Sequence, residues 1–298
     1  IYIPPPKVSI HPPIPIKKTY ITIETEINKL DDLIKLTETY PLKFDVEYNI
    51  NMEAIHNIKK PVIELKNMIG MNKLKDSILD QILYFIQEFH TQNKNNDFMH
   101  TVIYGATGTG KTEVAKLIGK VFSKLGILKQ GSFKKVTRAD LVAGYLGQTA
   151  IKTRDVITSA LGGVLFIDEA YSLGNTEKKD TFAKECIDTL CECLSKHKGE
   201  LMVIIAGYKD ELKNTFFKAN KGMESRFIWR FYLECYDHNE LQKIFEKKVQ
   251  ENECTIDIES SVLSNWFKTN YKDFPYYGRD VEQLFSYVKM SHGRRIYG

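Results

Sequence analysis

The chain lacks any apolar run of the length that a membrane span requires. A spanning helix needs about 20 consecutive apolar residues, and the longest apolar run, LMVIIAG from Leu201, is as short as a single strand. The first residues, IYIPPPKVSIHPPIPIKK, are too rich in proline for the apolar centre of a signal peptide. They also lack an initiator methionine, which indicates residues upstream of Ile1. No association with a membrane is therefore expected.

The chain also has few cysteines and a small net charge. The five cysteines are odd in number and unevenly spaced, which argues against a disulfide framework and predicts reduced thiols in a cytoplasmic compartment. Cys191 and Cys193, with His197 nearby, lack the second ligand pair of a zinc site and are expected in the core. A net charge of +4 over 298 residues is too small to indicate nucleic-acid binding by itself.

The N-terminal part of the sequence is the least regular. Most of the nine prolines lie within residues 1–20, which predicts an extended strap. Residues 21–67 follow as a small N-terminal extension, in which ETEINKLDDLIKLTETY has a helical period that ends at Pro41. The pattern from Tyr40 to Asn67 is mixed and predicts no element. A second helix is predicted from NKLKDSILDQILYFIQEFH, which has one broad apolar face.

Residues 68–236 alternate short apolar segments with longer helical ones. HTVIYG, KKVTRADL, GGVLFIDEA and ELMVIIAGY are predicted strands, and EVAKLIGKVFSKLG, IKTRDVITSALG and DTFAKECIDTLCECLSKH are predicted helices. Apolar strands separated by helices indicate an α/β fold in which helices cover both faces of a parallel sheet. Residues 237–298 contain helical patterns alone and predict a lid subdomain.

The stretch GATGTGKT matches the phosphate-binding loop pattern G-x-x-x-x-G-K-[ST]. It follows a predicted strand and opens a predicted helix, so backbone N–H groups of the turn can point at phosphate oxygens. Lys111 is then expected to neutralise the β- and γ-phosphates of ATP, and Thr112 to supply a hydroxyl to Mg²⁺. The nucleotide contacts predicted in this loop are Gly105, Ala106, Thr107, Gly108, Thr109, Gly110, Lys111 and Thr112.

An acidic pair ends the strand VLFIDEA. Parallel strands bring their carboxyl ends to one edge of a sheet, where ligands bind, so Asp168 and Glu169 are predicted to face the phosphate-binding loop. Asp168 is expected to hold Mg²⁺, and Glu169 to orient and deprotonate the attacking water. Together with the loop, this pair predicts a Mg²⁺-dependent ATPase that converts ATP and water to ADP and phosphate.

Two longer stretches resemble the CbxX/CfxQ branch of the AAA+ ATPases, which includes Rubisco-activase-like and stage V sporulation protein K-like members. They are TRADLVAGYLGQTAIKTRDVITSALGGVLFIDEAYSL and VIIAGYKDEL, and the similarity runs from Ile69 to the C-terminus. The resemblance implies a P-loop NTPase core, a helical lid, and assembly into a ring, usually a homohexamer, that binds ATP between subunits. It does not cover the N-terminal extension.

The resemblance implies functional roles for two arginines. Arg226, in ESRF, stands where the family places the arginine finger, which stabilises transition-state charge in the neighbouring subunit. Arg154 and Arg230 remain alternatives for that role, and a surface ion pair is the structural alternative for Arg226. Arg279, in YGRDVEQLF, matches the lid arginine called sensor 2, which contacts the γ-phosphate.

The resemblance also covers a segment expected beside the adenine ring, and it breaks down at the end of one strand. Ile69 and Gly70 match the segment that lies along the adenine ring. The strand that ends in Ala206, Gly207 and Tyr208 departs from the many AAA+ proteins that have Asn or Thr at this point, the residue called sensor 1. The polar role of sensor 1 is therefore unassigned in this chain.

The stretch AGYLGQ, residues 143–148, places Tyr145 and Leu146 between two glycines. It lies between a predicted strand and a predicted helix, where the resemblance implies a loop that faces the pore of the ring. In such a ring these two side chains would grip a threaded peptide. Packing of both side chains in the core is the alternative.

The sequence therefore predicts an ATP-driven motor that pulls on or remodels an unidentified protein client. A motor acting on nucleic acid is the main alternative, and it would need lysine or arginine in the pore loop to contact phosphates. AGYLGQ has no lysine or arginine, although Lys134, Lys135 and Arg138 are close in the sequence. A ring subunit in which nucleotide controls assembly alone is a third possibility.

Overall fold

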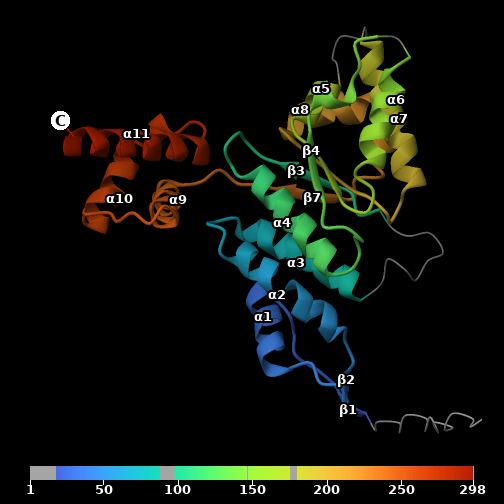
Figure 1. Cartoon of the computed structure of the whole chain (residues 1–298), viewed down its shortest axis with the longest axis horizontal. Helices are drawn as coiled ribbons and strands as arrows, with labels where there is room; N and C mark the ends of the chain where they lie inside the picture. The colour runs from blue at the N-terminus through green and yellow to red at the C-terminus, as the bar shows by residue number, and fades with distance from the viewer. Residues whose placement is uncertain (1–17, 88–97, 146, 175–179, 298) are drawn as a thin grey trace, which may run out of the picture.

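The computed structural model describes residues 18–87, 98–145, 147–174 and 180–297. It confirms the α/β fold, because a parallel sheet lies between two layers of helices (Figure 1). Most of the predicted strap and Leu146 lie outside the described residues. In spatial order the strands are β4 (Phe133–Val136), β5 (Val164–Ile167), β6 (Met202–Gly207), β3 (Thr101–Tyr104) and β7 (Trp229–Tyr232).

One face of the sheet is covered by α3 (Asn72–Ile86) and α4 (Lys111–Lys124), and the other by α6 (Thr149–Thr158) and α7 (Thr181–Lys196). Short helices and turns connect these elements. They are α5 (Arg138–Leu141), η2 (Ala170–Leu173), α8 (Lys209–Leu212), η3 (Lys213–Phe217) and η4 (Lys221–Met223).

Alternate residues of each strand enter opposite cores. Ile204 packs with α3 and α4, whereas its neighbours Val203 and Ile205 pack with α6 and α7. The core between the sheet and α6 and α7 buries Cys193, as expected, and also Cys186, whereas Cys191 is only partly buried and packs against this core. Within the described residues, no group of three or more His, Cys, Asp or Glu side chains is arranged to hold a metal ion.

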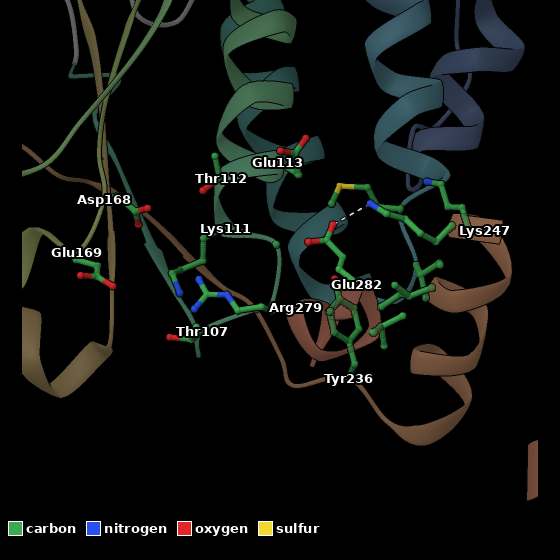
Figure 2. A pocket seen from close by; sticks show the side chains of 18 of the residues that line it. Thr107, Lys111, Thr112, Glu113, Asp168, Glu169, Tyr236, Lys247, Arg279 and Glu282 are labelled. Atoms are coloured by element: carbon green, nitrogen blue, oxygen red, sulfur yellow. Dashed lines mark hydrogen bonds and ion pairs between the residues drawn. The ribbon is translucent and has the colours of Figure 1, made fainter. Parts of the chain in front are cut away.

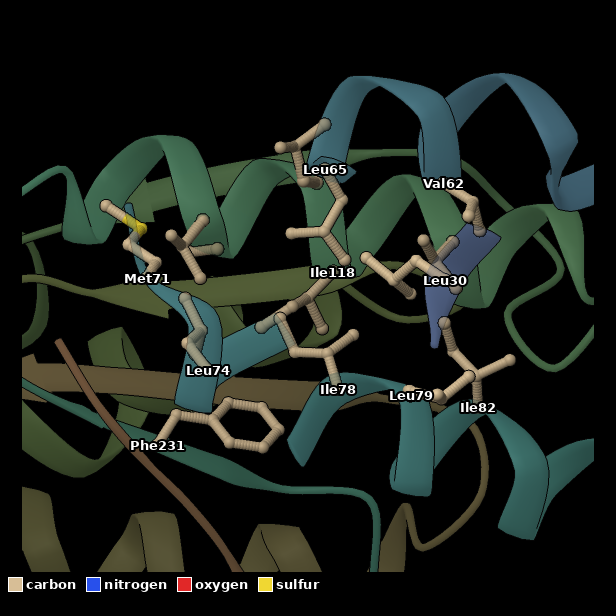
Figure 3. Packing of buried hydrophobic residues seen from close by; sticks show 14 of the residues in the cluster. Leu30, Val62, Leu65, Met71, Leu74, Ile78, Leu79, Ile82, Ile118 and Phe231 are labelled. Carbon is tan, nitrogen blue, oxygen red and sulfur yellow. The ribbon is translucent and has the colours of Figure 1, made fainter. Parts of the chain in front are cut away.

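The N-terminal extension folds onto the α/β core. β1 (Thr19–Ile21) and β2 (Val46–Tyr48) form a two-stranded parallel sheet, and α1 (Leu30–Thr39) packs against α2 (Met52–Lys66). α2 in turn packs along α4, and its Val62 and Leu65 join Ile118 of α4 in one apolar cluster (Figure 3). The helix α2 therefore supports the helix that follows the GATGTGKT loop.

The C-terminal region is helical, as the sequence predicted. It comprises α9 (His238–Glu251), α10 (Ser260–Thr269), the short turn η5 (Tyr271–Asp273) and α11 (Gly278–Tyr297). Aromatic rings form its interior, with Phe245 and Phe267 separated by 5.9 Å between centroids. Figure 1 shows the lid beside the α/β core, joined to it by the chain that leaves β7. None of the described helices is both long and apolar enough to cross a membrane.

Candidate functional site

The loop between β3 and α4 forms one wall of a cavity of about 440 Å³. Gly108 and Gly110 have φ values of 81° and 91°, which glycine adopts without strain. The turn allows α4 to begin at Lys111 with its N-terminus at the cavity (Figure 2). Unpaired N–H groups and the helix dipole favour an anion there. This wall can therefore bind phosphate groups.

The Lys111 ammonium lies over this turn. Its Nζ donates hydrogen bonds to the carbonyl oxygens of Gly105, at 3.0 Å, and Ala106, at 2.8 Å. Burial lowers the pKa of Lys111, and the carboxylates of Asp168 and Glu169 oppose that shift. A partly desolvated cation attracts a phosphate strongly, because little water screens the interaction. Lys111 is thus available to an anion that enters the cavity.

The acidic pair lies where β5 ends. Both carboxylates and the Thr112 hydroxyl line the same cavity (Figure 2). Asp168 forms an ion pair with Lys135 Nζ at 2.7 Å. Glu169 has a φ of 51°, a left-handed conformation that is costly for residues other than glycine and clusters at functional sites. A hydroxyl and a carboxylate are oxygen ligands of the kind that Mg²⁺ prefers, so Thr112 and Asp168 fit this ion.

The lid closes the cavity from the other side. The Gly278 N–H donates a hydrogen bond to the Gly108 carbonyl at 3.1 Å. A Cβ added at Gly108 would lie 1.8 Å from the Tyr276 carbonyl oxygen, so glycine is required for this close approach. α11 thereby directs its N-terminus and the Arg279 guanidinium towards the turn (Figure 2). Both contribute positive potential where phosphate groups would lie.

The segment between α2 and α3 completes the cavity. Ile69 lines it, and the neighbouring Gly70 has a φ of 66°. A Cβ at Gly70 would lie 2.2 Å from the Glu240 carboxylate, so this turn lies tightly against lid helix α9. The Tyr236 hydroxyl donates to the Thr109 carbonyl at 3.1 Å, and burial raises the pKa of Tyr236 to about 12. Tyr236 therefore attaches the start of the lid to the phosphate-binding turn.

Residues from distant parts of the sequence meet in this cavity. The predicted residues that line it are Ile69, Thr107, Gly108, Gly110, Lys111, Thr112, Asp168, Glu169 and Arg279. The other predicted nucleotide contacts lie beside the cavity rather than in its lining, and they are Gly70, Gly105, Ala106 and Thr109. Tyr208, noted in the sequence at the sensor 1 position, also lines the cavity, and lining residues that sequence reasoning missed include Tyr171, Tyr236, Lys247, Lys248 and Glu282.

Arg226 lies outside the lining of this cavity, on the chain between η4 and β7. Its Nε and Nη2 atoms donate to the Ser195 hydroxyl at 2.9 Å and 2.7 Å, and Nη1 donates to the Gly222 carbonyl at 2.6 Å. The guanidinium carbon also lies 5.8 Å from the centre of the Phe98 ring. These contacts hold the guanidinium in one orientation on a partly exposed surface.

The two other arginines considered for this role have acidic partners. Arg154 pairs with Glu192 at 3.2 Å, and Arg230 pairs with Glu224 at 3.2 Å. Within the described residues Arg226 makes no such pair. Its charge is therefore the least compensated of the three.

The loop that carries Tyr145 projects from the α/β core. The Tyr145 side chain is 74% exposed and does not pack in the core of its own chain. The base of the loop is held by the Thr149 hydroxyl, which accepts from Ala143 N–H at 3.2 Å, and by Lys152 Nζ, which donates to the Val142 carbonyl at 3.0 Å. A fixed base thus presents an exposed aromatic ring.

Comparison with known proteins identifies the family. Residues 101–229 match the family described as "ATPase family associated with various cellular activities (AAA)". Stage V sporulation protein K of Bacillus subtilis (strain 168) is 36% identical over 249 residues, which are 82% of this chain and 74% of that protein. The chain belongs to the CbxX/CfxQ family of AAA ATPases. A CfxQ-like protein of Acanthamoeba polyphaga mimivirus is also 36% identical, over 91% of this chain and 67% of its own length.

Solved structures agree with this assignment at the level of the fold. The AAA domain of FIGL-1, in complex with ADP, superimposes with a TM-score of 0.57 at 20% identity and covers 77% of this chain and 74% of its own. The sequence relatives confirm the resemblance to the CbxX/CfxQ family, and the solved structure supports the fold alone. This AAA ATPase binds nucleotide and hydrolyses ATP, and the cavity between the core and the lid is its candidate nucleotide site.

Proposed function

We propose that this AAA ATPase assembles into a ring and uses ATP hydrolysis to remodel or thread a protein client. The exposed Tyr145 on its fixed loop is the observation that carries the proposal. Exposure alone does not distinguish Tyr145, because Tyr20 and Phe44 are exposed at least as much; what distinguishes it is its place on the loop between α5 and α6, which is held at its base. In a ring, identical loops would meet around one axis and could share a polypeptide.

The chemistry of hydrolysis is assigned to residues of the cavity. Lys111 and Arg279 would neutralise the phosphates, and Glu169 would orient and deprotonate the attacking water. Thr112 and Asp168 would hold Mg²⁺, which offsets negative charge on the phosphates when it is bound. The role of Asp168 is supported by its place in the cavity lining and by its carboxylate, which already pairs with the Lys135 ammonium.

Arg226 is assigned to the neighbouring subunit's site. Three observations support this role: the guanidinium lies outside its own cavity, is partly exposed, and is held in one orientation by Ser195 and Gly222. A finger that acts between subunits needs this combination, since a mobile side chain would lose conformational freedom at every cycle. Ring assembly would place one such arginine at each nucleotide site.

The nucleic-acid alternative is weakened by the partners of the nearby cations. Lys134 Nζ donates to the Ser159 hydroxyl at 2.5 Å, Lys135 pairs with Asp168, and Arg138 pairs with Asp180. The carboxylates of Asp168 and Asp180 offset the charges of Lys135 and Arg138 and so weaken their attraction to a phosphate backbone, whereas Lys134 keeps its charge. A protein client, which an aromatic ring can contact without regard to sequence, is therefore favoured over nucleic acid.

The test uses the full chain with Tyr145→Ala and Tyr145→Phe. The probes are green fluorescent protein with an unstructured peptide tail, a reduced and carboxymethylated polypeptide, single-stranded DNA and RNA. Wild type and Tyr145→Phe should unfold the fluorescent protein and be stimulated by the polypeptide. Tyr145→Ala should do neither while keeping basal ATPase activity, and its stability should stay within about 0.5 kcal/mol of wild type.

Two results would contradict the proposal. A buried tyrosine would cost about 3–5 kcal/mol on truncation, so early melting of Tyr145→Ala with a proportional loss of ATPase would make the residue structural. Stimulation by DNA or RNA, with none by polypeptide, would support the motor on nucleic acid instead.

A further inference from the structure

The end of β6 brings a tyrosine into the nucleotide cavity. β6 lies between β5, which ends in the acidic pair, and β3, which leads into the phosphate-binding turn. The Gly207 carbonyl accepts a hydrogen bond from Gly105 N–H at 3.2 Å, so the strand end and the turn are joined. Tyr208 follows directly and lines the cavity. It occupies the point on the strand where many AAA+ proteins have a short polar residue.

The backbone of Tyr208 is fixed from both sides. α8 begins at the next residue, and the Tyr208 carbonyl accepts from Leu212 N–H at 2.9 Å. On the other side, a Cβ at Gly207 would lie 2.8 Å from the Tyr171 ring, which leaves no space for a larger residue. The Tyr208 and Tyr171 rings lie 6.1 Å apart between centroids. The direction of the Tyr208 side chain is therefore determined by packing.

The phenol hydroxyl reaches the phosphate-binding turn. It lies 2.9 Å from the Thr107 hydroxyl, a hydrogen-bond distance, although the two residues are 101 positions apart in the sequence. Lys111 Nζ lies 5.8 Å from the centre of the Tyr208 ring. Tyr208 is 38% exposed and is part of the cavity lining. A phosphate that binds Lys111 would thus come close to a neutral hydrogen-bond donor.

We propose that Tyr208 is a catalytic residue of this ATPase, whose hydroxyl donates a hydrogen bond to the terminal phosphate as hydrolysis proceeds. In phosphoryl transfer, negative charge spreads over the oxygens of the transferred group, and fixed donors stabilise it. Tyr208 exchanges its Thr107 partner for a phosphate oxygen and transfers no proton. The phenol thereby supplies the polar group that a shorter side chain supplies elsewhere. This role depends on ATP hydrolysis and not on the ring or the Tyr145 loop.

The test is Tyr208→Phe, which removes one oxygen and keeps the ring packed against Tyr171. Loss of one positioned donor lowers kcat by about 10²-fold in comparable sites, and we expect a fall of that order. The Kd for a fluorescent ADP analogue should change by no more than about twofold, because the donor acts on the terminal phosphate. Tyr232→Phe is the matched control. Tyr232 ends β7, which pairs with β3 and not with β6, and it lies outside the cavity lining, so this variant should keep wild-type kinetics.

Thr107→Ala separates a direct role from an indirect one. If Tyr208 acted through Thr107 alone, Thr107→Ala would reproduce the loss of kcat, and Tyr208→Phe would add nothing in the double variant. We expect the kcat of the double variant to be lower than that of Thr107→Ala, by a factor that differs from the Tyr208→Phe effect in wild type because the two hydroxyls are in contact. An unchanged kcat in Tyr208→Phe, no further loss in the double variant, or a melting temperature lowered together with ADP affinity would overturn the proposal.

Discussion

Acidification is expected to destabilise this ATPase through His100, a buried residue that precedes β3. The Nδ1 atom of His100 accepts a hydrogen bond from Val203 N–H at 3.1 Å, which requires that nitrogen to be unprotonated. Burial lowers the pKa of His100 to about 3, and the charges of Arg226 and Lys198 act in the same direction. A proton on this ring would break the Val203 hydrogen bond and add a third positive charge near Arg226.

The size of the effect follows from the difference between the pKa of His100 in the folded chain and its pKa in the unfolded chain. An unfolded histidine has a pKa of about 6.5, so below that pH the unfolded state binds a proton that the folded state excludes. Stability from His100 is therefore fully present above about pH 6.5 and is lost as the pH falls towards the folded pKa of about 3. The loss is about 1.4 kcal/mol at pH 5.5 and about 2.7 kcal/mol at pH 4.5.

The assay is urea unfolding at pH 7.5, 6.5, 5.5 and 4.5, with wild type and His100→Asn. The Asn side-chain oxygen can still accept from Val203 N–H but does not titrate. His100→Asn starts less stable at pH 7.5 because it leaves a cavity, yet its free energy of unfolding should fall less on acidification. The difference between the two proteins should narrow by about 2.7 kcal/mol from pH 7.5 to pH 4.5. If the free energies of unfolding of wild type and His100→Asn fall in parallel with pH, the reasoning is refuted, because all other carboxylates and histidines are present in both proteins.

Three further outcomes are expected from the nucleotide site. Lys111→Ala should weaken ATP binding by about 10²-fold or more, measured by titration with a fluorescent analogue, because charge-assisted hydrogen bonds to phosphate are lost. Glu169→Gln should bind ATP with near wild-type affinity and lower kcat by about 10²–10⁴-fold; normal turnover would assign water activation to another residue. Arg226→Ala should bind ATP normally and lose hydrolysis, and mixing it with Lys111→Ala subunits should restore part of the activity. If hydrolysis does not recover in rings shown to contain both variants, Arg226 is not the arginine that acts at the neighbouring subunit's nucleotide site.

The fold and the candidate site were predictable where the determining residues are contiguous. The GATGTGKT loop and the acidic end of β5 are local patterns, and the strands that lead to them, β3 and β5, are buried throughout because helices cover both faces of the sheet. β7 was missed, since Trp229, Arg230, Phe231 and Tyr232 alternate in burial at the edge of the sheet. α2 was missed because Pro61 lies inside it, and proline usually ends a helix.

Contacts between distant segments could not be derived from the sequence. Tyr208 and Thr107 are joined only because β6 and β3 are neighbours in the sheet, which no local pattern specifies. Tyr236 meets the carbonyl of Thr109 across 127 positions, and the strand that leads to it was not predicted. The exposure of Tyr145 also depends on how the loop is held at its base, which the flanking glycines alone do not determine.

The packing of α2 on α4 limits how this ATPase can be recombined with other proteins. A chimera that joined a foreign domain at residue 68 would leave Ile118 of α4 without Val62 and Leu65 and would turn an apolar stripe towards water. Each large side chain exposed in this way costs about 1.5–3 kcal/mol. Gene fusions that exchange the ATPase unit between family members should therefore carry residues 18–67 with it, and a graft that begins at the P-loop strand should be prone to aggregation.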